Sequence, residues 1–211
     1  MVLDKKVAEQ TINYLTQINA IKLNTKNPFT WTSGIKSPIY CDNRLILSYP
    51  NIRKFVADKM SDIVKNIYGE DISIAGVATG AIAIGAMIAE RLNLPYAYVR
   101  PEPKGHGLKN QIEGSIQEGS NVVVIEDLIS TGKSSLNAIN ALKSEGYNVM
   151  GMLSIFSYNF HFANKKFEDQ NISINSLSDY NSLVEKIESE GSLNEIEINR
   201  LKTWREDPKI W

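Results

Sequence analysis

Apolar positions along the chain recur with two different periods, and the two periods alternate. Helical spacing is found in four segments, residues 3–20, 50–68, 80–92 and 133–145. Runs typical of strands lie between and after these helices, over residues 72–78, 95–100, 121–126 and 147–156. Residues 26–49 hold several turn dipeptides and predict irregular structure. The pattern therefore predicts helix and strand in alternation through most of the chain.

Two of the strands are continuous apolar runs, VVVI at 122–125 and VMGMLSIF at 149–156. Runs without polar alternation are typical of strands that are covered on both faces, as in a parallel sheet. Together with the short links between elements, they predict an α/β fold with a doubly wound, mainly parallel central sheet flanked by helices. In such a sheet, ligands bind beyond the carboxyl ends of the strands.

The length of 211 residues favours a single domain over residues 1–211. Such a chain can bury a hydrophobic core without disulfides or a structural metal. The tail, residues 171–211, predicts one short strand and one or two polar helices. We expect it to be a C-terminal helical addition to the domain.

The composition of the chain argues against several classes of function. Lys and Arg number 23 and Asp and Glu 24, so the formal net charge is −1. A near-neutral chain is not expected to bind nucleic acid through its overall field. The single cysteine, Cys41, excludes an internal disulfide and favours a cytoplasmic protein without a targeting segment. The uncharged run at 74–89 is shorter than the roughly 18–20 residues that span a bilayer, so no membrane contact is expected.

The strongest local pattern is VVVIEDLISTGKSS, residues 122–135. A buried strand is predicted to end in two acids, Glu126 and Asp127, and a turn of small residues then leads into a helix. Backbone N–H groups, hydroxyls and a helix N-terminus are the parts of a phosphate cradle, and Gly132 lets the backbone approach a ligand closely. Two carboxylates beside such a cradle suit the hydroxyls of a ribose, and the pattern therefore predicts a ribose 5-phosphate site.

This segment allows two other interpretations. The sequence Gly132-Lys133-Ser134 imitates a nucleotide P-loop, but that motif needs a glycine at the position of Asp127. Alternatively, the two acids only end a strand and cap a helix. The small-residue turn after the buried strand argues against that simpler interpretation.

The segment 122–135 resembles the signature of type I phosphoribosyltransferases, which use phosphoribosyl pyrophosphate (PRPP). Three further segments resemble those of orotate phosphoribosyltransferases in particular. They are similar to the substrate segment (FTWTSGIKSPIYCDNR, 29–44), the pyrophosphate-binding turn (GVATGAIAIG, 76–85) and the mobile catalytic loop (YVRPEPKGHGLKNQIEG, 98–114). The four segments follow one another in the family's order.

The resemblance implies a reaction and an assembly. Family members transfer the phosphoribosyl group from PRPP to N1 of orotate with Mg²⁺, giving orotidine 5′-monophosphate and pyrophosphate in pyrimidine biosynthesis. It also implies a small N-terminal substrate-binding hood over residues 1–49 and a homodimer whose loop 101–116 is shared across the interface. Magnesium would be held mainly through PRPP, with Asp127 as the candidate protein contact through water.

The resemblance also implies site residues. Arg100, Lys104 and His106 would be catalytic. The residues implied to bind PRPP are Arg100, Lys104, His106, Thr79, Gly80, Glu126, Asp127, Leu128, Ile129, Ser130, Thr131, Gly132, Lys133 and Ser134. Physical chemistry agrees with this set, because cations and fixed donors stabilise an anionic leaving group. A long loop between two strands could also exclude water from the reaction.

For the base, the candidate contacts are fewer. Ser130 matches the family's orotate-contacting position, Tyr40 would line the ring, and Lys36 or Arg44 would face the carboxylate or a phosphate. Thr32 stands where many members have Lys, and the strand after the PRPP motif ends in Phe156-Ser157-Tyr158, where some members have Arg. Backbone N–H groups or Lys36 would then make the contacts to orotate that the Lys and Arg of other members make.

Two other functions that use a PRPP site would require other sequence features. A purine phosphoribosyltransferase would keep the PRPP site, but the segment 29–44 argues against it. A PRPP-sensing regulator would need an added nucleic-acid-binding element, which neither the N-terminal region nor the charge supplies. The sequence therefore favours a phosphoribosyl transfer enzyme acting on orotate.

Overall fold

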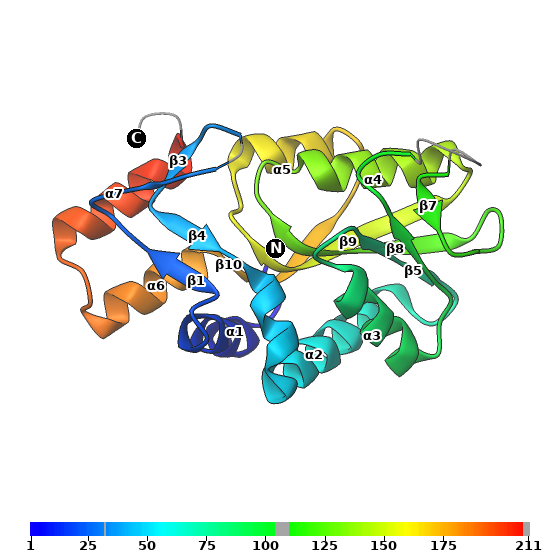
Figure 1. Ribbon diagram of the computed structural model, residues 1–211, viewed down its shortest axis with the longest axis horizontal. Coiled ribbons are helices and arrows are strands. Elements are labelled where there is room, and N and C mark those ends of the chain that lie inside the picture. The colour runs from blue at the N-terminus through cyan, green and yellow to red at the C-terminus, as the bar shows by residue number, and fades with distance from the viewer. Residues whose placement is uncertain (32, 104–109, 209–211) are drawn as a thin grey trace.

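A computed structural model describes residues 1–31, 33–103 and 110–208. Its centre is a six-stranded sheet with the strand order β10-β9-β8-β5-β6-β7 (Figure 1). The strands are β5 (Ser73–Val77), β6 (Tyr96–Val99), β7 (Ile112–Glu113), β8 (Asn121–Ile129), β9 (Asn148–Ser157) and β10 (Ile174–Asp179). All neighbours pair in parallel except β7, which is antiparallel to β6. The predicted doubly wound, mainly parallel sheet is confirmed.

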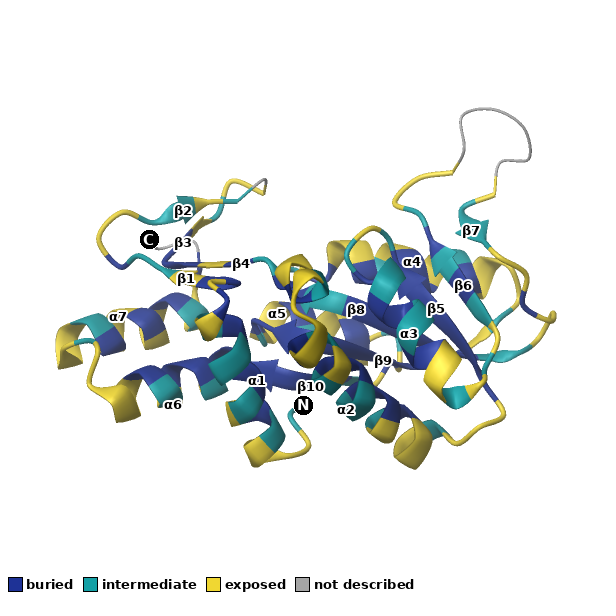
Figure 2. Ribbon diagram, turned by 60° about the horizontal axis from the view of Figure 1, so that its bottom comes forward, coloured by how far each residue is buried: buried dark blue, intermediate teal, exposed yellow. Residues whose placement is uncertain are grey.

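Helices cover both faces of this sheet (Figure 1). The helices are α1 (Lys5–Gln17), α2 (Pro50–Tyr68), α3 (Ile82–Leu92), α4 (Lys133–Ser144), α5 (His161–Glu168), α6 (Tyr180–Glu190) and α7 (Glu195–Glu206). One core cluster joins the apolar sides of α1, α2, α3, α6 and α7 to one face, and a second joins α4 and the end of α5 to the other. The strands between them are buried along most of their length (Figure 2). This double cover explains why β8 and β9 are apolar without alternation.

The N-terminal part forms two small antiparallel sheets and a 3₁₀ helix beside the main sheet. They comprise β1 (Ile21–Leu23), β2 (Phe29–Thr30), β3 (Lys36–Ser37), β4 (Ile39–Cys41) and η1 (Asn43–Ser48). Trp31 follows β2 and packs edge-on against Tyr158, with 4.8 Å between ring centroids, and against Trp204 of α7, at 5.9 Å. The indole Nε1 of Trp204 donates to the carbonyl of Lys36 at 2.8 Å. These contacts fix the β2–β3 hairpin against the end of β9 and the C-terminal helix.

Several boundaries differ from the sequence prediction. The helix expected over 3–20 is α1, which ends at Gln17, and the segment 26–49 is only partly irregular, since β2, β3, β4 and η1 lie within it. β8 continues to Ile129, so the two acids lie inside the strand and do not end it. β7 lies within the long loop expected between the strands at 95–100 and 121–126. The short strand of the tail is β10, which pairs with β9 and so belongs to the central sheet.

Helix α5 was not predicted, because its eight residues are too short for a clear apolar period. None of the helices in the described ranges is long and apolar enough to cross a membrane.

Candidate functional site

The fold creates one obvious place for a ligand. The chain runs from β5 to β6 on one side of the sheet, and from β8 to β9 and β10 on the other, so the order reverses between β5 and β8. At such a switch point the loops after the two strands diverge and leave a crevice at the carboxyl ends. The turn at Thr79 and Gly80 follows β5, and the segment from Glu126 to Ser134 ends β8 and begins α4. Both predicted anion-binding turns therefore face the same crevice.

Glu126 and Asp127 have different surroundings because successive side chains of a strand point to opposite faces. Glu126 is 5% exposed, and its carboxylate accepts from the Ser135 hydroxyl of α4 and from the Asp127 backbone N–H, each at 3.1 Å. Asp127 is half-buried, and its backbone carbonyl accepts a hydrogen bond from Asn43 at 2.7 Å. Of the two acids, Asp127 is therefore the one that is open to a ligand in the crevice.

Burial dominates the electrostatics of this pair. It raises the pKa of Glu126 well above its ordinary value, and the neighbouring Asp127 charge raises it further. Burial also raises the pKa of Asp127, opposed by hydrogen bonds and by the positive charge of Arg44. A ligand that brings hydroxyl donors or a cation to Asp127 would therefore stabilise its charged form.

The turn after β8 has the geometry of an anion cradle. Gly132 has φ +74°, a left-handed conformation that favours glycine, and a Cβ there would meet the Phe167 ring of α5. The left-handed backbone and the Phe167 ring both favour glycine at this position, and the expected close approach of a ligand stays a prediction. Within the described residues, no side chain caps the start of α4, and Lys133 and Ser134 are exposed. The first N–H groups of α4 are therefore available to an anion.

A cavity of about 540 Å³ lies next to this cradle. The described residues that line it are Thr30, Trp31, Ser33, Tyr40, Cys41, Leu128, Ser130, Thr131, Lys133, Ser134 and Tyr158. It combines an aromatic wall from the N-terminal part with the hydroxyls and the lysine of the cradle. A flat aromatic ligand joined to a phosphate would find both kinds of contact here.

The residues predicted to contact the base do not all line the same cavity in the structure. Ser130 and Tyr40 line this cavity, and Tyr40 is 39% exposed. Lys36 is exposed on β3 and is not among the described residues that line the cavity. Arg44 forms an ion pair with Asp42, in which Nε lies 2.6 Å from Oδ1, and this contact lowers the pKa of Asp42. Arg44 is therefore already engaged by a carboxylate of its own segment.

A second cavity, of about 660 Å³, adjoins the cradle on the side of β5 and β6. Arg100, Lys133 and Lys166 lie among its lining residues. Arg100 contacts Glu113 of β7 through an ion pair of 3.3 Å. Thr131, Lys133 and Ser134 line both cavities, so the cradle lies between them. Lys104 and His106, which the resemblance implies to be catalytic, lie outside the described residues.

The carboxylate and other metal-binding side chains of the site determine how it could hold a metal ion. In the described part of the chain, no three His, Cys, Asp or Glu side chains are grouped so that they could hold a metal. Mg²⁺ usually keeps several waters and binds one or two carboxylates together with substrate phosphates. Asp127 fits that pattern as a single protein contact, so the residues suit an ion that a phosphorylated ligand brings with it.

Three residues of this site were not predicted from the sequence. Ser135 donates to the Glu126 carboxylate, Asn43 donates to the backbone carbonyl of Asp127, and Trp31 contributes to the wall of the cavity. Asn43 and Trp31 are in the segment 29–44, but only their position relative to β8 reveals their contacts. Ser135 lies nine residues after Glu126, and the turn into α4 brings the two together.

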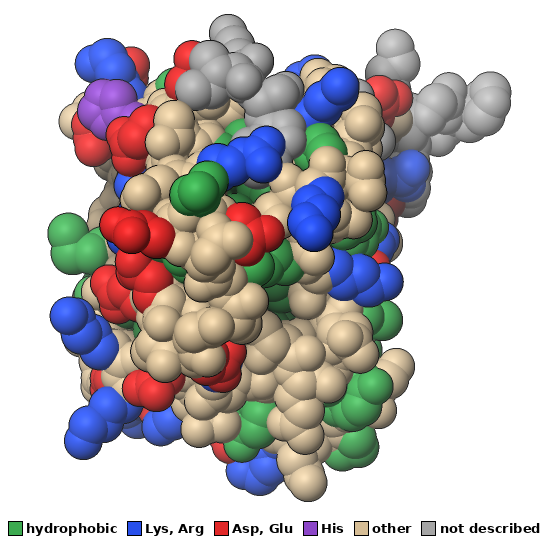
Figure 3. Space-filling view, turned by 90° about the vertical axis from the view of Figure 1, so that its left-hand side faces the viewer, with side chains coloured by type: hydrophobic (Ala, Val, Ile, Leu, Met, Phe, Trp, Pro, Cys, Tyr) green, Lys and Arg blue, Asp and Glu red, His purple; other side chains and the backbone are tan. Residues whose placement is uncertain are grey.

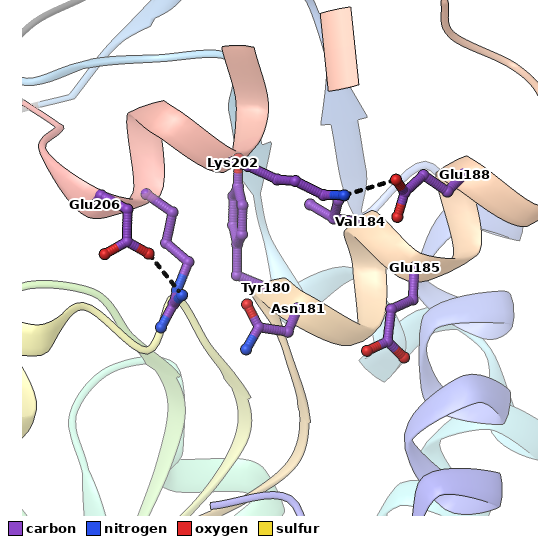
Figure 4. Close-up of a pocket in the computed structure, with 8 residues that line it drawn as sticks. Tyr180, Asn181, Val184, Glu185, Glu188, Lys202 and Glu206 are labelled. Carbon is purple, nitrogen blue, oxygen red and sulfur yellow. Dashed lines mark hydrogen bonds and ion pairs between the residues drawn. The ribbon is translucent and has the colours of Figure 1, made fainter. Parts of the chain in front are cut away.

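A further cavity, of about 430 Å³, lies between α6 and α7 (Figure 4). Four of its charged side chains form ion pairs, Lys202 with Glu188 at 2.6 Å and Arg205 with Glu206 at 3.0 Å. It shares no described lining residue with the cavities beside the cradle. We therefore place the candidate site at the switch point.

Comparisons with known proteins agree on one family. Residues 44–180 match the phosphoribosyl transferase domain family. The chain is 49% identical over 209 residues to the orotate phosphoribosyltransferase of Phocaeicola vulgatus, covering 99% of this chain and 97% of that protein. It is 44% identical over 207 residues to that of Porphyromonas gingivalis, covering 98% and 99%.

Solved structures show the same architecture. The crystal structure of orotate phosphoribosyltransferase from Aeropyrum pernix superposes with a TM-score of 0.71 at 29% identity, covering 87% of this chain and 99% of that chain. UMP synthase from Leishmania donovani superposes with a TM-score of 0.77 at 26% identity, covering 95% of this chain. The chain spans 42% of that longer protein.

Proposed function

The chain belongs to the orotate phosphoribosyltransferase family of pentosyltransferase enzymes, as its sequence motifs predicted, and we propose that the crevice between β5 and β8 is where it carries out that reaction. In this reaction the bond from the ribose C1 to pyrophosphate breaks, a bond from C1 to N1 of orotate forms, and the proton of N1 is released. The enzyme must therefore hold a ribose, its 5-phosphate, a pyrophosphate and a flat anionic base in fixed relation.

The segment from Glu126 to Ser134 supplies the first two contacts. The Asp127 carboxylate accepts hydrogen bonds from the ribose hydroxyls, and Glu126 supports it from the buried face of β8. Leu128 and Ile129 complete the strand. The 5-phosphate binds the turn of Ser130, Thr131 and Gly132 and the exposed start of α4 at Lys133 and Ser134.

The pyrophosphate binds on the side of the cradle that faces β5 and β6, in the 660 Å³ cavity. Thr79 and Gly80 precede Ala81, the N-cap residue of α3, and no described side chain caps this helix. Arg100 directly follows β6 and lines the 660 Å³ cavity. Lys104 and His106 complete this set as catalytic contacts by family resemblance. Positive groups on this side stabilise the negative charge that develops on the leaving group.

Orotate occupies the 540 Å³ cavity. Its ring packs between the aromatic wall that includes Tyr40 and the end of β8, and the Ser130 hydroxyl contacts its polar edge. Lys133 is the cation among the described lining residues and attracts the anionic ligand. Lys36 remains a candidate for the carboxylate, because its side chain is exposed on the same hairpin.

Three further features are part of the proposal. When bound with PRPP, Mg²⁺ would neutralise phosphate charge, with Asp127 in contact through water. The functional unit is a homodimer whose loop 101–116 reaches the neighbouring site, which accounts for a loop rich in glycine and cations. The enzyme works in the cytoplasm, as the single buried cysteine suggests.

The observation that carries the proposal is the convergence of both anion-binding turns on one crevice beside an aromatic-walled cavity. The test is a spectrophotometric assay with purified protein, PRPP, Mg²⁺ and orotate. We expect the ultraviolet absorbance of orotate to fall only when PRPP is present. No change with orotate, combined with consumption of xanthine or adenine, would transfer the assignment to a purine enzyme.

A PRPP-sensing regulator would instead need a surface for nucleic acid. The face in Figure 3 carries acidic and basic side chains together and presents no single basic patch. The assay separates the two functions, because a regulator would bind PRPP without turnover.

A further inference from the structure

Asn43 joins the N-terminal part of the chain to the strand that carries the two acids. It is the first residue of η1, and its side chain is 1% exposed. Its Nδ2 donates to the backbone carbonyl of Asp127 at 2.7 Å, across 84 residues of sequence. Its Oδ1 accepts from the Cys41 thiol at 3.2 Å. Both ends of one buried amide are therefore engaged.

These two bonds fix the amide in one orientation. A backbone carbonyl can only accept, so the nitrogen of the amide must face Asp127. The amide oxygen then faces Cys41, whose thiol acts as a donor. Turning the amide over would place its oxygen against the Asp127 carbonyl, where neither atom can donate, so the bond to Asp127 would be lost. Asn43 is thus a defined connection between β4 and β8 that a residue filling space alone would not provide.

The two hydrogen-bond partners of Asn43 belong to different parts of the site. Asp127 bears the carboxylate that is open to the crevice, and Cys41 lines the 540 Å³ cavity. The direction of a carboxylate depends on the orientation of its own backbone, because Asp has a short side chain. A bond that holds the Asp127 carbonyl therefore also restricts where its carboxylate points.

We propose that Asn43 is a positioning residue that aligns the Asp127 carboxylate with the hydroxyls of a bound ribose 5-phosphate group. The identity of this ligand rests on the function proposed above. Asn43 does not touch the sugar. It acts through the Asp127 backbone, and its bond with the Cys41 thiol helps to hold the side chain in place.

The test compares four variants. Asn43→Leu replaces the amide with an apolar group of similar size, and Asn43→Ala removes it if leucine does not fit. Cys41→Ala removes only the thiol bond. The control is Thr25→Val, because Thr25 is also buried in the N-terminal part and bonds Glu197 of α7 at 3.0 Å without contacting Asp127.

Two readouts separate positioning from general support of the fold. Calorimetry with PRPP and Mg²⁺ measures binding, and steady-state kinetics give kcat and both KM values. For Asn43→Leu or Asn43→Ala, we expect PRPP to bind about tenfold more weakly and kcat/KM for PRPP to fall at least as far, while KM for orotate changes less than threefold. Cys41→Ala should weaken PRPP binding by less than threefold, because the bond to Asp127 remains.

The control decides the interpretation. Thr25→Val should bind PRPP as the unchanged protein does, even if its Tm falls by a similar amount. If folded Asn43 variants bind PRPP within twofold of the unchanged protein, or if Thr25→Val shows the same loss, the proposal is overturned.

Failure of the proposed function would look different. If the unchanged protein binds PRPP but does not consume orotate, the base assignment fails, and the binding comparison still tests Asn43. If the unchanged protein does not bind PRPP, both proposals fail.

Discussion

The carboxylate of Asp127 occupies the space that a side chain at Gly80 would need. A Cβ built on Gly80 would overlap Cγ and both carboxylate oxygens of Asp127. The turn after β5 and the end of β8 are therefore in direct contact at the switch point. Gly80 has no left-handed φ, so this contact, and not backbone strain, is what requires glycine there.

Gly80→Ala should therefore impair the site more than the fold. The added methyl group can be accommodated only if the Asp127 carboxylate moves, and we expect PRPP to bind at least about tenfold more weakly, equivalent to ~1.4 kcal/mol. Calorimetry with PRPP measures the effect. Gly85→Ala is the control, since its Cβ would meet the Tyr96 ring within the β5–α3 packing, away from Asp127. Normal binding by Gly80→Ala would show that the carboxylate position is not critical.

Asp127→Asn should lose PRPP binding and keep the fold. An amide retains the shape of the side chain, but it replaces one of the two acceptor oxygens that face a ribose diol with an NH2 donor and removes the negative charge. Because burial raises the pKa of Asp127, replacing the charge with a neutral group should leave Tm unchanged or slightly higher. Thermal unfolding and PRPP titration should be run on the same preparation. Unaltered PRPP kinetics would reject the role as a diol acceptor.

Trp204→Phe should loosen the hairpin that bears Trp31. The substitution removes the bond from the indole to the Lys36 carbonyl and leaves a ring of smaller size. We expect the free energy of unfolding to fall by about 1–2 kcal/mol, as for a lost buried hydrogen bond. Urea denaturation gives this value, and KM for orotate should rise while KM for PRPP stays constant. A rise in both KM values would mean that α7 supports the whole site.

The Cys41 thiol should react slowly with alkylating reagents at neutral pH. Burial raises its pKa well above the ordinary value, and the charges of Asp127 and Asp42 raise it further. The thiolate is the reactive form, so the alkylation rate should be low at pH 7 and should keep rising with pH up to the raised pKa. Iodoacetamide labelling followed by mass spectrometry is unambiguous because the chain has one cysteine. Orotate should slow labelling further, and denaturant should abolish the protection. Rapid labelling of the folded protein at pH 7 would contradict the burial.

Local sequence predicted much of the central sheet and its helices. Helix α2 was predicted with its observed boundaries, because Pro50 suits the first turn of a helix and Gly69 follows its end. β8 and α4 were recognisable because a run of valines and isoleucine precedes a turn of small residues. Short elements such as α5 and β7 were missed, since eight or two residues cannot display a period.

The sequence by itself determined the chemistry that is available: two adjacent acids, a turn able to bind phosphate, and motifs that identify the family. These are local properties, because hydrogen-bonding capacity, charge and turn formation depend on neighbouring residues. Only the tertiary structure decided which acid faces the crevice, that the Phe167 ring packs against Gly132, and that Asn43 bonds the Asp127 carbonyl across 84 residues. Such contacts join residues far apart in sequence, and packing of the whole chain, which no local pattern encodes, brings them together.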